Sequence, residues 1–403
     1  MTGAVRPPTG PEDGPVVVLG AGYAGLSVAQ GVARRGRDRI PVILIDRHPV
    51  HVLRTELYEV GRLAAAGEDA RSWTVPLARV LERTSVEFRQ GDVRSIDLDH
   101  RQVELDGGSV SFGTLAICLG SVASYYGVPG APELTHQVYR LSGAQRLARE
   151  LKETEVRSAQ LPGEARPRVL VIGGGSTGTE LAAEIATTDW RKVSGPGARP
   201  PDVFLLTGSL PFLAGLSPKL IARARSVLHR VGVTMIHGYN VTRVDPGRVG
   251  IADGSELACD LAVWCAGLEA PKVVRELPVP HGKAGRIAVG PTLEVPGVPG
   301  VFAVGDVAEL RDPETGSVVP GTAQAAIAEA RTAAQNLLAR RTGVPLVPFQ
   351  YRERGVLVSL GRGAAAGAVR HVTIWGSPAA LLKRIVQREY AVSVERGEAS
   401  GLL

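Results

Sequence analysis

Two glycine-rich turns carry the residue types and the spacing that suit binding of a nucleotide diphosphate. The first is Gly20-Ala21-Gly22-Tyr23-Ala24-Gly25, which directly follows the apolar residues 15–19. At this spacing Gly20 permits a tight turn, Gly22 lets the backbone approach a pyrophosphate, and Gly25 lets a helix pack on a strand. The free N–H groups and the positive dipole at the start of such a helix favour the diphosphate.

The elements that must position this turn are a strand, a helix and a second strand. Residues 15–19 are mostly β-branched, which is typical of a buried parallel strand. Residues 26–35 have helical composition, and residues 42–45 form a second apolar run that ends on Asp46. An acid at this place can accept hydrogen bonds from a ribose diol. The pattern therefore predicts a βαβ unit that binds a dinucleotide.

The same pattern recurs about one domain later in the chain. Residues 168–172 lead into Gly173-Gly174-Gly175-Ser176-Thr177-Gly178, and residues 179–187 favour a helix. Two such units in one chain indicate two dinucleotides that face each other. The chemistry that this arrangement favours is hydride transfer from a nicotinamide to a flavin.

Composition places the chain among globular proteins and argues against nucleic acid as a partner. The 403 residues favour two or three domains, and 44% of them are hydrophobic. Aromatic residues make up only 4%, whereas proteins that stack single-stranded bases need aromatic platforms. The net charge of +6 comes mostly from arginines spread along the sequence, so we expect no nucleic-acid site.

Three scattered cysteines limit the redox chemistry that the protein can perform. Cys118, Cys259 and Cys265 form no Cys-x-x-Cys pair, which excludes a relay between neighbouring thiols and favours buried core cysteines. We expect no metal site and a cytoplasmic location, with peripheral placement at the inner face of the membrane as an open alternative. No apolar run reaches the ~18 residues that span a bilayer.

The order of these motifs resembles the two-dinucleotide-binding-domain flavoprotein superfamily and, within it, the type II NADH dehydrogenases, which are NADH:quinone oxidoreductases. The resemblance covers residues 15–345. Its most specific stretches are Asp46-Arg47-His48 with Leu57-Tyr58, residues 173–181 with Glu180, residues 285–289, and residues 304–308 with Thr322-Ala323-Gln324.

The fold that we expect is α/β, with two Rossmann-like domains, the second inserted in the first, and a small C-terminal α+β piece. The predicted domains are a flexible tail over 1–14, an FAD-binding domain over 15–135 and 285–345, an NAD(P)H-binding domain over 136–284, and a C-terminal region over 346–403 with an amphipathic helix at 378–390. We also predict helices over 73–81 and 141–152, and a linker over 153–167.

The resemblance implies the cofactors FAD and NADH or NADPH, and it assigns residues to each. Glu180, beside the hydride path, and Gln324, at the flavin edge, are the candidate catalytic residues; the alternative for Glu180 is a solvated helix glutamate. The implied FAD site comprises Gly20, Gly22, Tyr23, Ala24, Gly25, Asp46, Arg47, Val93, Leu119, Gly120, Gly305, Asp306, Ala323 and Gln324. The implied NAD(P)H site comprises Gly173, Gly175, Ser176, Thr177, Gly178, Glu180, Thr207 and Gly267.

The choice between NADH and NADPH stays open in the sequence. An acid at the end of the second unit's second strand would favour NADH through the ribose 2′-hydroxyl. This place instead reads Leu205-Leu206-Thr207-Gly208-Ser209. Thr207 and Ser209 can bind a hydroxyl or a phosphate, and Arg223 or Arg225 could assist.

The electron acceptor that the resemblance implies is a quinone. Three features depart from the pattern of quinone-reducing relatives. Ala323-Gln324 is not followed by a second glutamine, Glu56 replaces an apolar residue, and the short segment 378–390 stands in place of aromatic-rich C-terminal helices. The alternatives are a soluble reductase of a ferredoxin-type protein or of a small biosynthetic substrate, and a flavin-bound redox sensor. Residues 378–390 could contact a membrane or pack on the protein or a second subunit, and a homodimer stays open.

Overall fold

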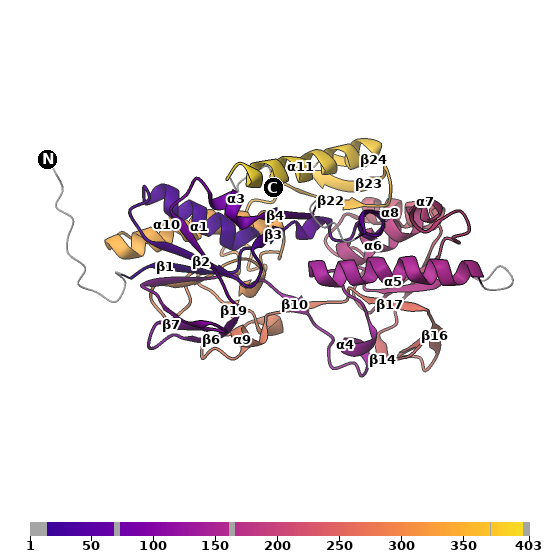
Figure 1. Cartoon of the computed structure of the whole chain (residues 1–403), viewed down its shortest axis with the longest axis horizontal. Helices are drawn as coiled ribbons and strands as arrows, with labels where there is room; N and C mark the ends of the chain where they lie inside the picture. Colours follow the sequence, from indigo (N-terminus) through magenta and orange to yellow (C-terminus); the bar gives the residue numbers. More distant parts are fainter. Residues whose placement is uncertain (1–13, 68–72, 161–165, 371, 398–403) are drawn as a thin grey trace.

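Two parallel sheets form the framework of the chain, and each is built around one of the glycine-rich turns. The computed structural model describes residues 14–67, 73–160, 166–370 and 372–397. The first sheet has the order β20-β9-β1-β2-β5, and the second has the order β13-β12-β11-β17. Central strands such as β1 are continuous runs of buried apolar residues, as expected when helices cover both faces of a parallel sheet. We call the two units the first and the second lobe (Figure 1).

The first lobe contains the turn at residues 20–25 between β1 and α1. Helices α1 and α10 pack side by side, because Gly31 of α1 leaves room for the side chain of Ala334. The bounds of its main elements are β1 Val16–Leu19, α1 Tyr23–Arg35, β2 Val42–Asp46, β5 Val86–Gln90, β6 Val93–Asp97, β7 Gln102–Leu105, β8 Gly108–Ser111, β9 Thr114–Ile117, α9 Lys272–Arg275, β20 Val301–Ala303 and α10 Ala323–Thr342.

The second lobe repeats this plan around the turn at residues 173–178. Helices α5 to α8 accompany its parallel sheet, and β14, β15 and β16 form a small antiparallel sheet. The bounds are α5 Leu141–Gln160, β11 Arg168–Ile172, α6 Ser176–Thr187, α7 Trp190–Ser194, β12 Asp202–Thr207, α8 Pro218–Arg230, β13 Val233–His237, β14 Val241–Asp245, β15 Arg248–Ile251, β16 Glu256–Ala258 and β17 Leu261–Trp264.

Two short strands connect the lobes. β10 (Val122–Ala123) leaves the first lobe and pairs antiparallel with β18 (Leu268–Glu269), which returns to it. Ala131 packs in the core of the second lobe, whereas Val274 packs in the core of the first. We therefore propose that the domain boundaries lie at β10 and β18 rather than at residues 135 and 284.

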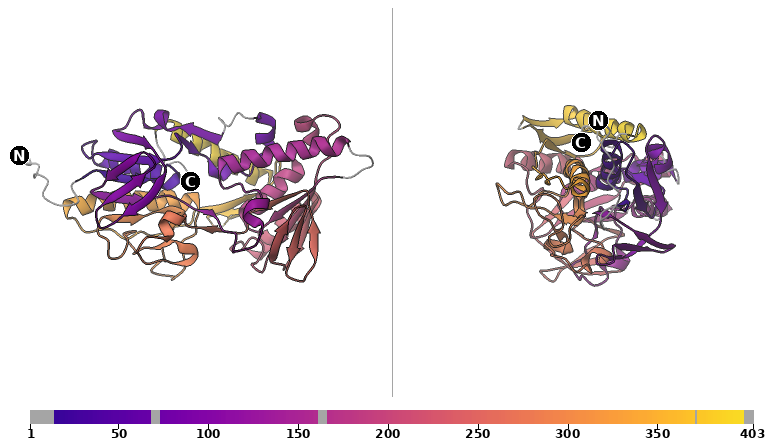
Figure 2. Two further views of the ribbon diagram at one scale, coloured as in Figure 1. Left: turned by 60° about the horizontal axis from the view of Figure 1, so that its bottom comes forward. Right: turned by 90° about the vertical axis from the view of Figure 1, so that its left-hand side faces the viewer.

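The C-terminal segment lies over the junction of the two lobes (Figure 1 and Figure 2). Strands β22 (Gly355–Ser359), β23 (Ala365–Val369) and β24 (Val372–Gly376) form a meander, and α11 (Ser377–Glu395) packs against it. β22 contacts α6 of the second lobe, and α11 contacts α3 and β4 of the first. The remaining elements are β3 Val50–Val52, η1 Arg54–Glu56, α2 Val60–Ala66, β4 Thr74–Pro76, α3 Leu77–Leu81, α4 Ala131–Leu134, η3 Lys283–Gly285, β19 Ile287–Ala288, η4 Gly305–Val307 and β21 Ala308–Glu309.

Several local predictions differ from the structure. The helix predicted to end at residue 152 continues to Gln160, so the predicted linker begins too early; the buried Thr154 and Glu155 extend the helix's packed face. The helix predicted over 73–81 starts as β4, because Pro76 is confined to a helix start. The tail predicted over 1–14 lies outside the described residues except for Gly14. No helix in the described part of the chain is long and apolar enough to cross a membrane.

Candidate functional site

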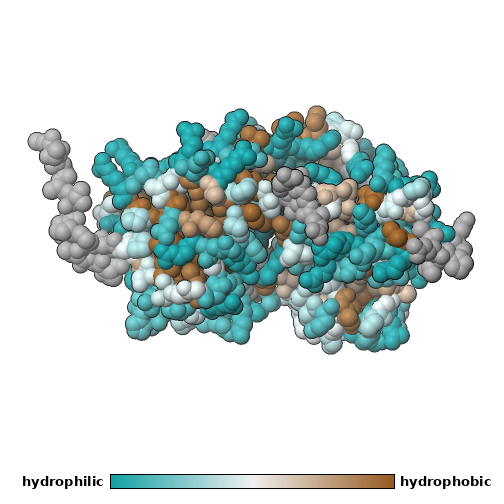
Figure 3. All heavy atoms as spheres, in the orientation of Figure 1, coloured by the Kyte–Doolittle hydropathy of each residue, from teal (hydrophilic) through white to brown (hydrophobic). Residues whose placement is uncertain are grey.

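One cavity of about 1280 Å³ lies where the two lobes and the C-terminal segment meet. Its walls include the first glycine turn, the start of α6 and the side of α11. Figure 3 shows the surface hollowed between the two lobes. Ordinary small-molecule pockets measure roughly 300–1,000 Å³, so this cavity is large enough for an extended ligand such as a dinucleotide.

Of the three glycines in the first turn, only Gly22 leaves free space where a side chain would stand. A Cβ on Gly20, whose φ is +97°, would lie 2.4 Å from the carbonyl oxygen of Cys118, and a Cβ on Gly25 would lie 1.8 Å from that of Gly20. A Cβ on Gly22 would meet nothing within 4 Å. Gly22 is the N-cap of α1, and because glycine has no side chain, no side chain caps the first N–H groups of this helix. The turn thus leaves both space and N–H donors for a pyrophosphate.

Asp46 at the end of β2 braces this turn. Its Oδ2 accepts a hydrogen bond from the N–H of Ala21 at 2.7 Å, and its Oδ1 accepts one from the N–H of His48 at 2.9 Å. A carboxylate oxygen has two lone pairs, so each oxygen can still accept from a ribose hydroxyl. The neighbouring Arg47 also lines the cavity, 3.4 Å from Asp92.

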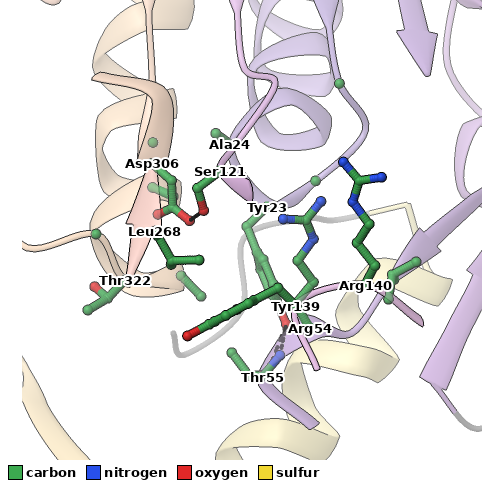
Figure 4. A pocket seen from close by; sticks show the side chains of 18 of the residues that line it. Tyr23, Ala24, Arg54, Thr55, Ser121, Tyr139, Arg140, Leu268, Asp306 and Thr322 are labelled. Carbon is green, nitrogen blue, oxygen red and sulfur yellow. Dashed lines mark hydrogen bonds between the residues drawn. The ribbon is translucent and has the colours of Figure 1, made fainter. Parts of the chain in front are cut away.

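The opposite wall holds a second carboxylate. Asp306 accepts a hydrogen bond from the hydroxyl of Ser121 at 2.9 Å, and Figure 4 shows these side chains pointing toward each other. The preceding Gly305 has a φ of +78° and donates its N–H to Glu329 of α10 at 2.7 Å. Glu329 thus holds the backbone that presents Asp306 to the cavity.

Glu329 should make stability depend on pH. Burial raises the pKa of its carboxyl to about 7, so the folded protein keeps a proton that the unfolded chain loses near pH 4.5. The stabilisation is complete below pH 4.5 and is lost as the pH rises to 7, by about 3 kcal/mol. Glu329→Gln should remove this decline, which denaturant unfolding between pH 4.5 and 8 measures. The exposed Glu314→Gln is the control, and an unchanged pH profile in Glu329→Gln would refute the assignment.

The second glycine turn repeats the geometry of the first. A Cβ on Gly173 would lie 2.5 Å from the carbonyl oxygen of Cys265, and one on Gly178 would lie 2.0 Å from that of Gly173. A Cβ on Gly175 would meet nothing within 4 Å, and Gly175 is likewise an N-cap without a side-chain cap. The next residues, Ser176 and Thr177, line the same cavity as Gly22.

Glu180 lies one turn into α6 and is buried, so the alternative of a solvated helix glutamate is wrong. Its Oε1 accepts a hydrogen bond from the backbone N–H of Ser359 at 2.9 Å and forms an ion pair with Lys383 of α11. Both Glu180 and Lys383 line the cavity. Residues from the second lobe and from the C-terminal helix therefore meet at one wall.

The structure brings most of the sequence-predicted site residues to this cavity. In the first lobe all of them line it except Gly25, which is packed inside the turn. In the second lobe Ser176, Thr177 and Glu180 line it, whereas the glycines of the turn, Thr207 and Gly267 do not. Gly267 is covered by Tyr126, whose Oη would lie 1.9 Å from a Cβ there. The roles of these residues stay predictions.

Several residues that line the cavity were not predicted by any sequence motif. Arg54 belongs to η1, and Tyr139 and Arg140 directly precede α5. Figure 4 shows both arginines projecting into the space beside Tyr23. Burial, followed by repulsion from Arg47 and Arg54, lowers the pKa of Arg140. Two guanidinium groups suit a diphosphate, but no sequence motif predicted them because both arginines lie outside the glycine-rich turns and the ends of the parallel strands.

A buried histidine links the first turn to α11. Nδ1 of His51 lies 2.8 Å from the carbonyl oxygen of Ala21, and its Nε2 lies 3.1 Å from the hydroxyl of Tyr390. Burial lowers the pKa of His51 to about 4, so the neutral ring donates from Nδ1 and accepts at Nε2. The C-terminal helix thereby helps to hold the glycine turn.

All three cysteines are free and buried, which confirms the expectation of core residues. Cys118 also lines the cavity, and burial raises the pKa of its thiol well above the usual range. The thiol is therefore protonated at neutral pH and is a poor nucleophile. No group of three or more His, Cys, Asp or Glu side chains in the described ranges could hold a metal ion.

Comparisons with known proteins show which family and fold this chain resembles. A profile of the pyridine nucleotide-disulphide oxidoreductase family matches residues 14–330. The demethylphylloquinone reductase of Synechocystis sp. is 28% identical over 92% of this chain and 90% of that protein. An NADH dehydrogenase-like protein of Mycobacterium tuberculosis is 31% identical over 96% of each chain. The solved structure of NDH2 from Plasmodium falciparum in complex with NADH shares the fold, with a TM-score of 0.80 at 14% identity over 96% of each chain.

Proposed function

This chain belongs to the pyridine nucleotide-disulphide oxidoreductase family and is an FAD-dependent oxidoreductase, and from that premise we propose that it oxidises NAD(P)H and passes the electrons to a quinone. The observation that carries the proposal is the pair of glycine turns, at Gly22 and Gly175, each with space for a phosphate and each leading to one cavity. FAD, once bound, supplies a ring that accepts a hydride from the nicotinamide and later releases two electrons.

The residues of the first lobe fit FAD. The turn at residues 20–24 would hold the pyrophosphate, and Asp46 the ribose. The oxygens of Ser121 and Asp306 would accept hydrogen bonds from ribityl hydroxyls, because the Ser121 hydroxyl already donates to Asp306. Ala323 and Gln324 begin the 20-residue helix α10 and line the cavity. The positive end of this helix would stabilise negative charge on a reduced ring.

The residues of the second lobe and of α11 fit the electron donor, NAD(P)H, and the electron acceptor, a quinone. The start of α6 would hold the pyrophosphate of NAD(P)H, and the buried ion pair of Glu180 and Lys383 would orient groups beside the ring. The cavity wall contributed by the C-terminal segment contains Leu357, Leu382 and Val386. An apolar wall next to a charged pair suits a planar quinone, whose ring is apolar and whose oxygens are polar.

One face of α11 points away from the cavity. We propose that this face contacts a membrane that holds the quinone. Leu381 is 55% exposed and Ile385 is 50% exposed, although Leu382 and Val386 face the cavity. Figure 3 shows apolar side chains among the hydrophilic ones along the upper edge, where Figure 1 places α11. Arginines 384 and 388 add positive charge, as is common in helices that lie on anionic lipid.

Val386→Gln should raise the KM for a soluble quinone about 10-fold, because a polar amide at the apolar wall weakens ring binding by about 1–2 kcal/mol. The rate at which NAD(P)H reduces the flavin should not change. Steady-state assays with a soluble quinone, together with anaerobic stopped-flow reduction of the flavin, separate the two steps. The matched control is Ile385→Gln on the exposed face, which should leave both values unaltered.

Two outcomes would count against a quinone acceptor. One is equal quinone kinetics in Val386→Gln and the unmodified protein. The other is poor turnover with quinones but rapid, salt-sensitive turnover with a ferredoxin-type protein, because electrostatic docking between proteins weakens as salt is added.

A further inference from the structure

The carboxyl end of β12 has no acidic residue, and the helix that follows it is positively charged. Residues 207–215 contain neither aspartate nor glutamate, and the following helix α8 contains lysine, arginine and histidine but no acid. In a nucleotide-binding βαβ unit this strand end lies beside the adenosine ribose. An acid there binds the 2′-hydroxyl of NADH, whereas an arginine accommodates the 2′-phosphate of NADPH. The inference below rests on the proposed function, since it concerns the same nucleotide site.

The structure distinguishes between Arg223 and Arg225, two of the three arginines of α8. The guanidinium of Arg223 lies 4.9 Å from the centre of the Trp375 ring, so it is directed toward β24. The guanidinium of Arg225 instead lies 5.7 Å from the centre of the Phe212 ring. Only Arg225 is therefore held on the side of α8 that faces the loop after β12.

Phe212 places Arg225 beside the second glycine turn. A Cβ on Gly174 would lie 2.6 Å from Cγ2 of Thr207 and 3.5 Å from Cδ2 of Phe212. In addition, the N–H of Leu213 donates to the carbonyl oxygen of Gly174 at 2.9 Å. The glycine turn, the end of β12 and the residue under the Arg225 guanidinium are thus in direct contact.

Further polar groups gather at the same strand end. Oγ1 of Thr207 lies 2.9 Å from Nδ1 of His237, the last residue of β13. Burial and then the charge of Arg225 lower the pKa of His237. The N–H of Ser209 donates to Oδ1 of Asn240 at 3.0 Å, which fixes the backbone that carries the Ser209 hydroxyl.

We propose that Thr207, Ser209, Arg225 and His237 form a binding site for the 2′-phosphate of NADPH, and that this enzyme prefers NADPH to NADH. Arg225 supplies the charge, and its planar guanidinium can donate two parallel hydrogen bonds to a phosphate. The hydroxyl of Ser209 and the exposed imidazole of His237 add neutral donors, and no carboxylate of residues 207–215 opposes the phosphate. Thr207 is buried, and its hydroxyl holds the imidazole of His237 in place.

The direct test is calorimetric titration of the full flavin-loaded chain with adenosine 2′,5′-bisphosphate and with 5′-AMP. The two probes differ only in the phosphate at the 2′ position, so the proposal expects the 2′,5′-bisphosphate to bind about 10- to 100-fold more tightly. Arg225→Gln should abolish most of this advantage and leave the affinity for 5′-AMP unchanged. The matched control, Arg223→Gln, removes the same charge from the same helix and should keep the advantage.

The outcomes separate this inference from the proposed function. If NADH and NADPH reduce the flavin equally well and the two probes bind equally, the 2′-phosphate site is refuted while the proposed function stands. If Arg225→Gln and Arg223→Gln reduce the affinity advantage of the bisphosphate equally, the 2′-phosphate site is also refuted, because the effect would then come from the overall charge of the helix. If neither nucleotide reduces the flavin, the proposed function fails, and tight Arg225-dependent binding of the bisphosphate would still support the site.

Discussion

Gly22→Val should yield a folded protein that no longer holds FAD. Gly22 has a φ of −75°, so valine is compatible with the backbone, and its side chain would meet no protein atom within 4 Å at the Cβ. It would instead occupy the space that the pyrophosphate needs. We expect the affinity for FAD to fall at least ~100-fold, since both the contact and the N–H donors of the turn are blocked.

The measurement is the flavin absorbance of the purified variant, together with its circular dichroism. The matched control is Gly175→Val, the same change at the equivalent position of the second turn. That variant should stay yellow but resist reduction by NAD(P)H. A Gly22→Val protein with full flavin content, or a Gly175→Val protein that NAD(P)H reduces normally, would contradict the assignment of that turn.

Lys383→Met should destabilise the protein by about 3 kcal/mol or more. The side chains of Lys383 and Glu180 are only 13% and 11% exposed, and removal of one partner leaves the other charge buried without its ion pair. Lys383 also lies 4.7 Å from the centre of the Tyr58 ring, so a cation–π contact is lost as well. The double variant Glu180→Gln/Lys383→Met should recover part of the loss, because no unpaired charge remains.

Denaturant unfolding of the flavin-loaded proteins measures this effect. The control is Lys192→Met, which breaks an exposed ion pair with Asp189 in which the lysine side chain is 83% exposed; that change should cost less than about 1 kcal/mol. If Lys383→Met and Lys192→Met are equally mild, the pair does not anchor α11 to the second lobe. If the double variant is no more stable than Lys383→Met, the two residues are not energetically coupled.

Sequence patterns predicted the two glycine turns and their flanking strands because these constraints are local. At Gly20 and Gly173 a positive φ and close contact with a neighbouring backbone require glycine, and such requirements recur at fixed spacing. The parallel strands follow from runs of buried β-branched residues. The length of α5 was missed because a polar composition hides the buried face around Glu155.

The parts of the site that sequence could not supply depend on tertiary contacts. Glu180 and Lys383 are 203 residues apart, and no pattern connects them. The sequence does not distinguish Arg223 from Arg225, which lie in the same helix. Only their aromatic neighbours, Trp375 and Phe212, show which arginine faces the second glycine turn. The cavity wall at α11 likewise depends on how the C-terminal segment packs over both lobes.

The proposal that two nucleotides meet in one cavity is tested most directly by anaerobic titration of the flavin-loaded protein with NADPH and, separately, NADH. Absorbance of the oxidised flavin should disappear on addition of nucleotide, at lower concentrations of NADPH than of NADH, and should return when a soluble quinone is added. A flavin that binds but is bleached by neither nucleotide would contradict the proposal, because the second turn would then not deliver a nicotinamide to the cavity.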